Sequence, residues 1–196
     1  YAYYVSGIFL LIGVFIGINQ IKLLGEQLKL LKKDMMDRAH RASVEKSVEY
    51  LKYYATRILP AYGEYKKKFT KEVPSPASNA KKLFDGKFNK SLDELEKIVV
   101  VELIIKQEFG LSQLFNELEY FSAAIQGRLT DEDMVFTPVA RSFCNMIEEE
   151  HLLLSIMRNR GAPFKNVIEL YQKWKTRLEV EKYELQRQEA EIKIKQ

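Results

Sequence analysis

The chain has 196 residues, a formal net charge of +4 and a single cysteine, Cys144. One cysteine excludes an internal disulfide and agrees with a reducing compartment. Five prolines and nine glycines are too few for a disordered or β-rich chain.

Residues 1–18 carry no charged side chain. At 1.5 Å per residue, such a helix spans about 27 Å, close to the roughly 30 Å hydrocarbon core of a bilayer. A cleaved signal peptide would need basic residues before the apolar run and a small-residue cleavage site after it. Here the basic residues follow the run, and Asn19, Gln20 and Ile21 come directly after it. We therefore expect a single transmembrane helix over residues 1–24.

The first basic residues all lie on the C-terminal side of the uncharged run of residues 1–18. An excess of Lys and Arg marks the cytoplasmic side of a spanning helix. We therefore expect a single-pass protein of the inner (plasma) membrane with a cytoplasmic C-terminus. The lysines nearest the bilayer are expected to face anionic lipid headgroups; they are Lys22, Lys29, Lys32 and Lys33.

Gly13 and Gly17 form a G-x-x-x-G pair, which lets two spanning helices approach closely. The alternative is that glycine is simply common in such helices.

Apolar residues then recur in steps of three and four, which is typical of heptads. The pattern predicts a juxtamembrane helix over residues 25–59, ended by Pro60. Two stripes are out of register across residues 37–41, so the contact face is expected to rotate there. The first is Ile21, Leu24, Leu28, Leu31 and Met35; the second is Val44, Val48, Leu51, Ala55 and Ile58.

Residues 60–180 are expected to form a cytoplasmic helical domain. A capping box at Ser91 and Glu94 precedes the β-branched run of residues 95–109. This run has strand propensity but no partner strand, so we expect a buried helix. The other expected helices cover 61–71, 111–125, 131–158 and 166 onward, with an irregular segment at 72–89 and a charged helical tail at 181–196. The expected fold is thus all-α: one transmembrane helix continuing into a juxtamembrane helix, plus a helical bundle.

The stretches LFNELEYFSAAIQGRLTDEDM (Leu114–Met134) and IELYQKW (Ile168–Trp174) resemble a bacterial family catalogued as domain of unknown function 4760. The resemblance covers about sixty residues in detail and implies a membrane helix, a long juxtamembrane helix and a small helical domain. It carries no established activity. Within it, Asn116 and Glu119 form a polar pair on an apolar face, for which Arg141, Arg158 and Arg160 are candidate partners.

The sharpest chemical pattern is Glu148-x-x-His151, because Glu-x-x-His is the spacing of carboxylate-bridged di-iron bundles. Asp37-x-x-His40 repeats it, and Glu102 and Glu119 are further candidate ligands. The competing interpretation is a charged run on a helix surface, which we favour; we predict no metal and no cofactor.

Two other patterns favour structural interpretations. Cys144 lies on a core-facing helix and is expected to be buried packing. Lysines interleave with aromatic rings in a patch that nucleic acid might use, but we favour a solvated or lipid-facing surface. The patch is Lys66, Lys67, Lys68, Lys71, Lys81 and Lys82 with Tyr62, Tyr65 and Phe69.

The sequence therefore predicts a membrane-anchored, non-catalytic scaffold or regulatory subunit that holds a partner or a homo-oligomer at the cytoplasmic face. The alternatives are a di-metal carboxylate enzyme with a helical-bundle fold and an oligomeric membrane effector.

Overall fold

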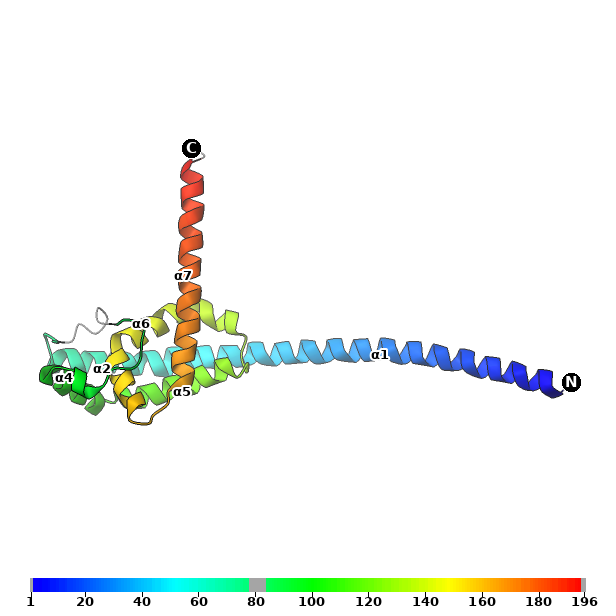
Figure 1. The fold of residues 1–196 in the computed structure, drawn as a ribbon, viewed down its shortest axis with the longest axis horizontal. Coiled ribbons are helices and arrows are strands. Elements are labelled where there is room, and N and C mark those ends of the chain that lie inside the picture. Colours follow the sequence, from blue (N-terminus) through cyan, green and yellow to red (C-terminus); the bar gives the residue numbers. More distant parts are fainter. Residues whose placement is uncertain (1, 78–83, 195–196) are drawn as a thin grey trace. The chain divides into compact units, whose positions relative to one another are not determined.

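The computed structural model describes the backbone of residues 2–77 and 84–194, and the side chains of residues 17, 19–77 and 84–192. Within these residues helices are the only regular secondary structure (Figure 1), which confirms the all-α class. The elements are α1 (Ala2–Tyr53), a π-helical turn (Tyr54–Ile58), α2 (Leu59–Glu72), a 3-10 turn (Leu92–Glu94), α4 (Lys97–Glu108), α5 (Leu111–Gln126), α6 (Glu132–Asn159) and α7 (Lys165–Ile194).

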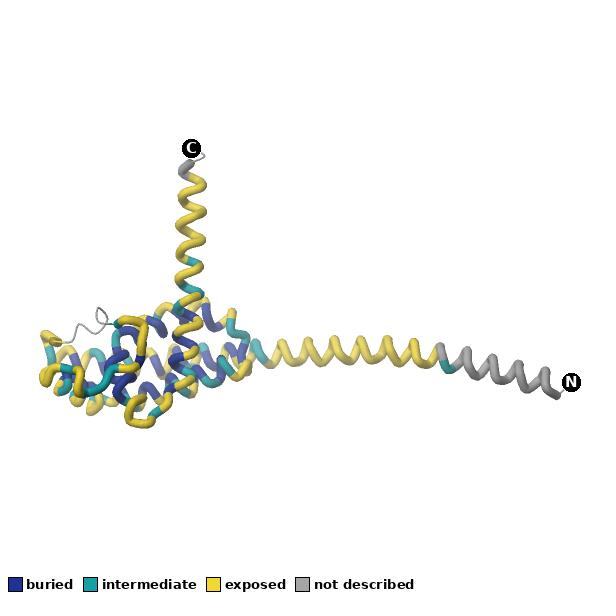
Figure 2. Tube along the Cα trace, viewed as in Figure 1, coloured by how far each residue is buried: buried dark blue, intermediate teal, exposed yellow. Residues whose placement is uncertain are grey.

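The chain divides into two compact units, Tyr1–Ala42 and Ser43–Gln196. Helix α1 belongs to both, because its last residues enter the core of the second unit. In the first unit, residues 19–42 are exposed along their whole length (Figure 2).

No helix within the described residues is both long enough and apolar enough to cross a bilayer. The predicted span over residues 1–24 falls largely on residues 1–16 and 18, whose side chains lie outside the described set. The transmembrane assignment therefore stays a prediction.

The prediction that Pro60 ends the long helix is wrong. The chain passes through the π-helical turn and continues as α2, with Pro60 in its first turn. Proline has no N–H to donate, and a helix start is where that donor is not needed. The N–H of Leu59 bonds to the carbonyl of Tyr54 five residues earlier, so the widened turn precedes the proline and keeps the chain helical.

The predicted second stripe is also wrong in part, because Val48 and Ala55 are exposed. The buried face consists of Ser47, Tyr50, Tyr54 and Ile58. Tyrosine can pack its ring in the core and still satisfy its hydroxyl. The Tyr50 hydroxyl lies 3.2 Å from that of Tyr120, and the Tyr54 hydroxyl lies 3.1 Å from Ser142 Oγ.

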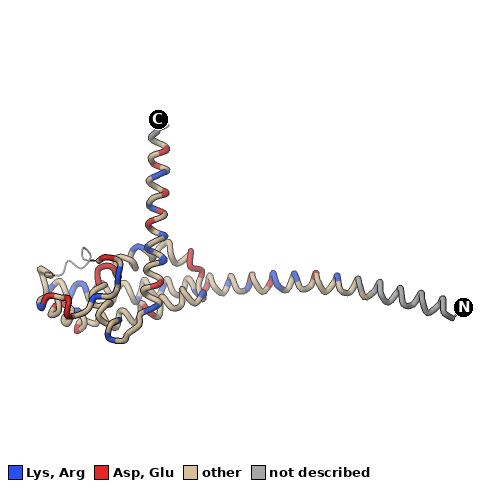
Figure 3. Tube along the Cα trace, viewed as in Figure 1, with Lys and Arg blue, Asp and Glu red and all other residues tan. Residues whose placement is uncertain are grey.

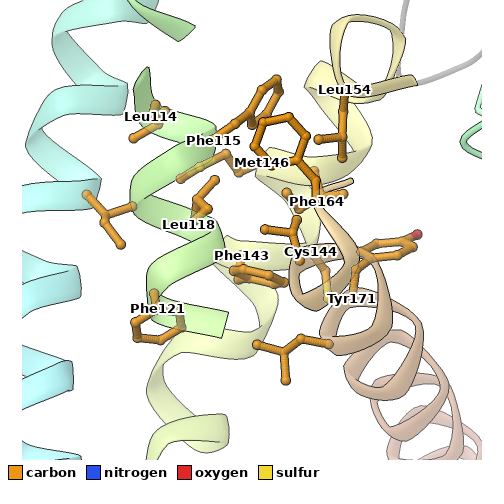
Figure 4. Close-up of a cluster of buried hydrophobic side chains, with 14 of the residues drawn as sticks. Leu114, Phe115, Leu118, Phe121, Phe143, Cys144, Met146, Leu154, Phe164 and Tyr171 are labelled. Atoms are coloured by element: carbon orange, nitrogen blue, oxygen red, sulfur yellow. The ribbon is translucent and has the colours of Figure 1, made fainter. Parts of the chain in front are cut away.

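Helices α5, α6 and α7 build the core around Trp174, which is fully buried. Its ring meets Phe143 and Phe136 edge-on, at 5.3 and 5.8 Å between ring centroids. Figure 4 shows side chains from these three helices meeting in one apolar cluster. Cys144, in this cluster, is buried as expected.

Helix α4 is a helix, as predicted, but it is not a buried one. Val99 and Leu103 face the core, whereas Ile98, Val101 and Ile104 are more than half exposed. Two charged residues, Glu102 and Lys106, occupy the buried face instead. Helix α4 thus combines buried charges with exposed apolar side chains, unlike an ordinary amphipathic surface helix.

Local helix signals are confirmed at two places. Glu94 accepts hydrogen bonds from the N–H and the hydroxyl of Ser91, although this box begins the 3-10 turn rather than α4 itself. Asp131 caps α6 by accepting from the N–H groups of Asp133 and Met134. The charged tail is helical to Ile194, and its described residues after Glu181 are exposed.

Candidate association surface on helix α1

Among the described side chains of the first unit, one exposed apolar stripe follows heptad spacing: Ile21, Leu24, Leu28, Leu31 and Met35. Their exposed fractions lie between 57% and 72%. Steps of three and four place all five on one face of a helix. We call this stripe the α1 seam. It has the a/d spacing of a coiled coil, in which each apolar residue inserts between four residues of a neighbouring helix.

The seam continues toward the N-terminus. Gly17 precedes Ile21 by four residues and therefore lies on the same face. Open space surrounds the position that a Cβ would take at Gly17. Gly13, the other half of the predicted helix-association pair, lies outside the described side chains.

The predicted lipid-facing lysines are all exposed on the same helix. With Ile21 in the first heptad position, Lys22 and Lys29 fall at position b and Lys33 at f, on faces turned away from the seam. Lys32 falls at position e, at its edge. Figure 3 shows how basic residues recur along this part of α1. The seam and most of the cationic side chains therefore use different faces.

Glu119 does not pair with an arginine. Its carboxylate accepts hydrogen bonds from the N–H of Asn166 at 3.1 Å, the N–H of Val167 at 2.9 Å and the side-chain amide of Asn166 at 2.8 Å. These N–H groups belong to the first turn of α7, so Glu119 caps that helix from α5. Asn116 is exposed.

The candidate metal ligands are distributed over several elements. Asp37 and His40 are exposed on α1, Glu102 is buried on α4, and Glu148 and His151 are buried on α6. No group of three or more His, Cys, Asp or Glu residues within the described part of the chain is arranged to hold a metal ion. His151 Nδ1 lies 3.1 Å from the carbonyl oxygen of Glu148, and burial lowers the pKa of the ring.

Glu148 connects α6 to α7. Its carboxylate accepts a hydrogen bond from the Tyr171 hydroxyl at 3.1 Å and forms an ion pair with Lys175 at 2.6 Å. The hydrogen bond to Glu148 raises the pKa of Lys175. These groups border an open cavity of about 450 Å³ beside Phe84 and Gly86. Their mutual pairing is a structural link between two helices.

The predicted basic patch does not expose its aromatic rings. Tyr65 and Phe69 are buried, and the Tyr62 hydroxyl donates to Glu149 at 2.7 Å, so these rings face the protein interior. Lys66 pairs with the same Glu149 at 3.1 Å. Lys81 and Lys82 lie outside the described residues.

Sequence reasoning missed the ion pair between Lys106 and Glu150, which joins α4 to α6 at 2.6 Å. The signal was present: Glu102 and Lys106 both fall within the largely apolar run of residues 98–109, and a buried charge needs a partner. Comparisons with protein-family models, with curated proteins and with solved structures found no match. The functional proposal therefore rests on the residues and geometry of this chain.

Proposed function

We propose that the chain is a membrane-anchored, non-catalytic scaffold or regulatory subunit whose copies associate through the α1 seam at the cytoplasmic face of the inner (plasma) membrane. The observation that carries the proposal is the exposure of Ile21, Leu24, Leu28, Leu31 and Met35 along one helix face. Leu28, Leu31 and Met35 lie beyond the proposed span, and removing one such side chain from water stabilises an association by about 1.5 to 3 kcal/mol before entropic costs.

The anchor is proposed from the sequence of residues 1–24. The apolar run, the lysines that follow it and the exposed helix after them form one continuous order of segments. The resemblance of Leu114–Trp174 to domain of unknown function 4760 implies the same order and belongs to the proposal. Two copies anchored in one membrane leave it in the same direction, so the seam is proposed to form a parallel pair.

A parallel pair makes a sharp prediction for cysteine crosslinking. Each seam residue faces the same residue of the second chain, whereas equivalent residues on the far side of α1 are separated by both helices. Single cysteines are therefore introduced in the Cys144→Ala background at Leu28 and Leu31, and at Lys29 and Lys33 as matched controls. In isolated membranes, Leu28→Cys and Leu31→Cys should crosslink to themselves and the controls should not. Equal yields at all four positions, or none at any, would contradict the seam.

The anchor has its own test. The protein should stay with membranes after alkaline carbonate extraction. A reporter enzyme that works only in the cytoplasm should be active when fused after Gln196. Release by carbonate would refute the anchor while leaving the seam to be judged separately.

The same preparation discriminates the two alternative functions. Stoichiometric iron or manganese that disappears in His151→Ala or His40→Ala would favour a di-metal enzyme. Conductance across liposomes would favour a membrane effector. The scaffold proposal expects neither.

A further inference from the structure

Helix α4 buries two charged side chains beside Val99 and Leu103, and it leaves three large apolar side chains exposed. On the inner face, the Glu102 carboxylate accepts the backbone N–H of Ala77, and Lys106 pairs with Glu150 on α6. Glu102 and Lys106 are each at least 95% buried. The inner face therefore fixes the orientation of α4 through polar contacts, and rotation about its axis would break them.

The outer face is left apolar by this orientation. Ile98, Val101 and Ile104 are exposed by 57%, 54% and 52%. Beside them, Val100, Leu103 and Ile104 border an apolar cavity of about 180 Å³ against Leu153 and Ile156 of α6. A contiguous apolar patch of this kind, on a helix whose other side is held by charges, is a mark of an interaction surface.

The charges at the ends of this patch indicate its partner. At about 100° per residue, Lys97 and Glu108 both lie within roughly 40° of Val101 around the helix axis. Both are exposed. The patch is thus positive at the N-terminal end and negative at the C-terminal end. When two copies of this helix run antiparallel, the positive end of one lies beside the negative end of the other. When they run parallel, like charges lie side by side and repel each other.

We propose that α4 pairs with α4 of a second copy of this chain, antiparallel, about a two-fold axis at Val101. Ile98 then faces Ile104 of the second copy. Lys97 comes within about one helical turn of Glu108 of that copy, which a lysine side chain can reach. Both charge pairs form at once, because a two-fold contact repeats every interaction.

The α4 contact is small. A few side chains from each copy bury less than the roughly 1,200 Å² of a stable interface, so the contact needs help to persist. The proposal therefore rests on the proposed association through α1, which would hold copies at high effective concentration. The two contacts use different elements and can be tested separately.

The test uses the full chain in membranes, in the Cys144→Ala background, with a short bismaleimide crosslinker. Val101→Cys should crosslink to itself. Lys97→Cys should not, because the two copies of residue 97 lie about 12 Å apart along the helix axis, and Glu108→Cys should not for the same reason. Coexpressed Lys97→Cys and Glu108→Cys chains should crosslink to each other.

A charge swap tests the partner directly. Lys97→Glu and Glu108→Lys should each lower the Val101→Cys yield by roughly fivefold, and combining them should restore it. Lys67→Glu, a matched reversal of an exposed lysine on α2, should leave the yield unchanged.

Three outcomes overturn the proposal. Self-crosslinking at all three positions would mean a parallel pair. No α4 crosslink while Leu28→Cys still crosslinks would mean that another molecule covers α4, and the scaffold proposal would stand. If Leu28→Cys fails as well, the association through α1 is refuted, and with it the basis of the α4 proposal.

Discussion

The ammonium group of Lys106 lies 2.6 Å from the carboxylate of Glu150, and both side chains are buried. Removing one member of such a pair leaves an uncompensated buried charge. We expect Lys106→Met to lower the free energy of unfolding by about 3 to 5 kcal/mol near neutral pH. The double variant Lys106→Met/Glu150→Leu should be markedly more stable than Lys106→Met alone. Denaturant titration measures both, and a single variant as stable as the wild type would refute the pairing.

The pH dependence of Lys106→Met has a definite sign. Burial already raises the pKa of Glu150, even beside Lys106. Without the cation this pKa rises further, so the folded state holds a proton at Glu150 that the unfolded state releases near pH 4.3. Stability should therefore fall as pH rises from about 4.3 through the raised pKa, more steeply than in the wild type. A flat difference between the two proteins from pH 4 to 8 would contradict this.

Glu119→Ala should destabilise the second unit by about 2 kcal/mol. The substitution removes three hydrogen bonds to the start of α7 and a negative charge at its positive end. The stability of Glu119→Gln should fall between those of the wild type and Glu119→Ala, because the amide oxygen can still accept a hydrogen bond. The control is Glu189→Ala on the exposed tail, which should change stability by less than about 0.5 kcal/mol. Equal melting temperatures for Glu119→Ala and Glu189→Ala would show that the cap does not matter.

These interactions show which parts of the structure a sequence can predict. A short-range signal can be predicted: the capping box joins Ser91 and Glu94, which lie three residues apart. Glu119 was recognised as needing a partner, but its partners lie 47 and 48 residues away and are backbone groups of a helix that only the fold brings near.

Pro60 and α4 were misjudged for a different reason. A π-helical turn before Pro60 is a local adjustment that no residue pattern announces. The isoleucines of α4 were assigned to the core because they are apolar, yet Lys106 and Glu102 occupy the inner face. The Lys106–Glu150 ion pair joins residues 44 positions apart, so no local pattern predicts it.

His151 should make stability depend on pH on the acid side. Burial lowers the pKa of its ring, so the folded state holds the ring neutral while the unfolded chain takes up a proton near pH 6.5. Stability is therefore fully present above about pH 6.5 and declines as pH falls toward the lowered pKa. His151→Asn keeps a donor near the Glu148 carbonyl but cannot titrate, and its stability should decline less between pH 7 and 5. His40→Asn, on the exposed part of α1, should keep the wild-type decline.

Cys144 should be unreactive in the folded protein. Burial raises the pKa of its thiol to about 12, and the thiolate is the form that attacks. At pH 8 the thiolate population should be roughly a thousandfold below that of the unfolded chain. A disulfide reagent should thus label Cys144 rapidly in denaturant and very slowly without it. Rapid labelling of the native protein would show that this part of the core opens readily.

The central claim is that copies associate through the α1 seam, and the mass of the full chain in detergent measures it most directly. Light scattering, corrected for bound detergent, should give at least twice the mass of one chain for the wild type. Leu28→Lys/Leu31→Lys should give the mass of one chain. Leu30→Lys/Met36→Lys adds the same charges at similarly exposed positions away from the seam and should keep the wild-type mass. A wild-type protein with the mass of a single chain, or equal masses for the two lysine variants, would contradict the proposed seam.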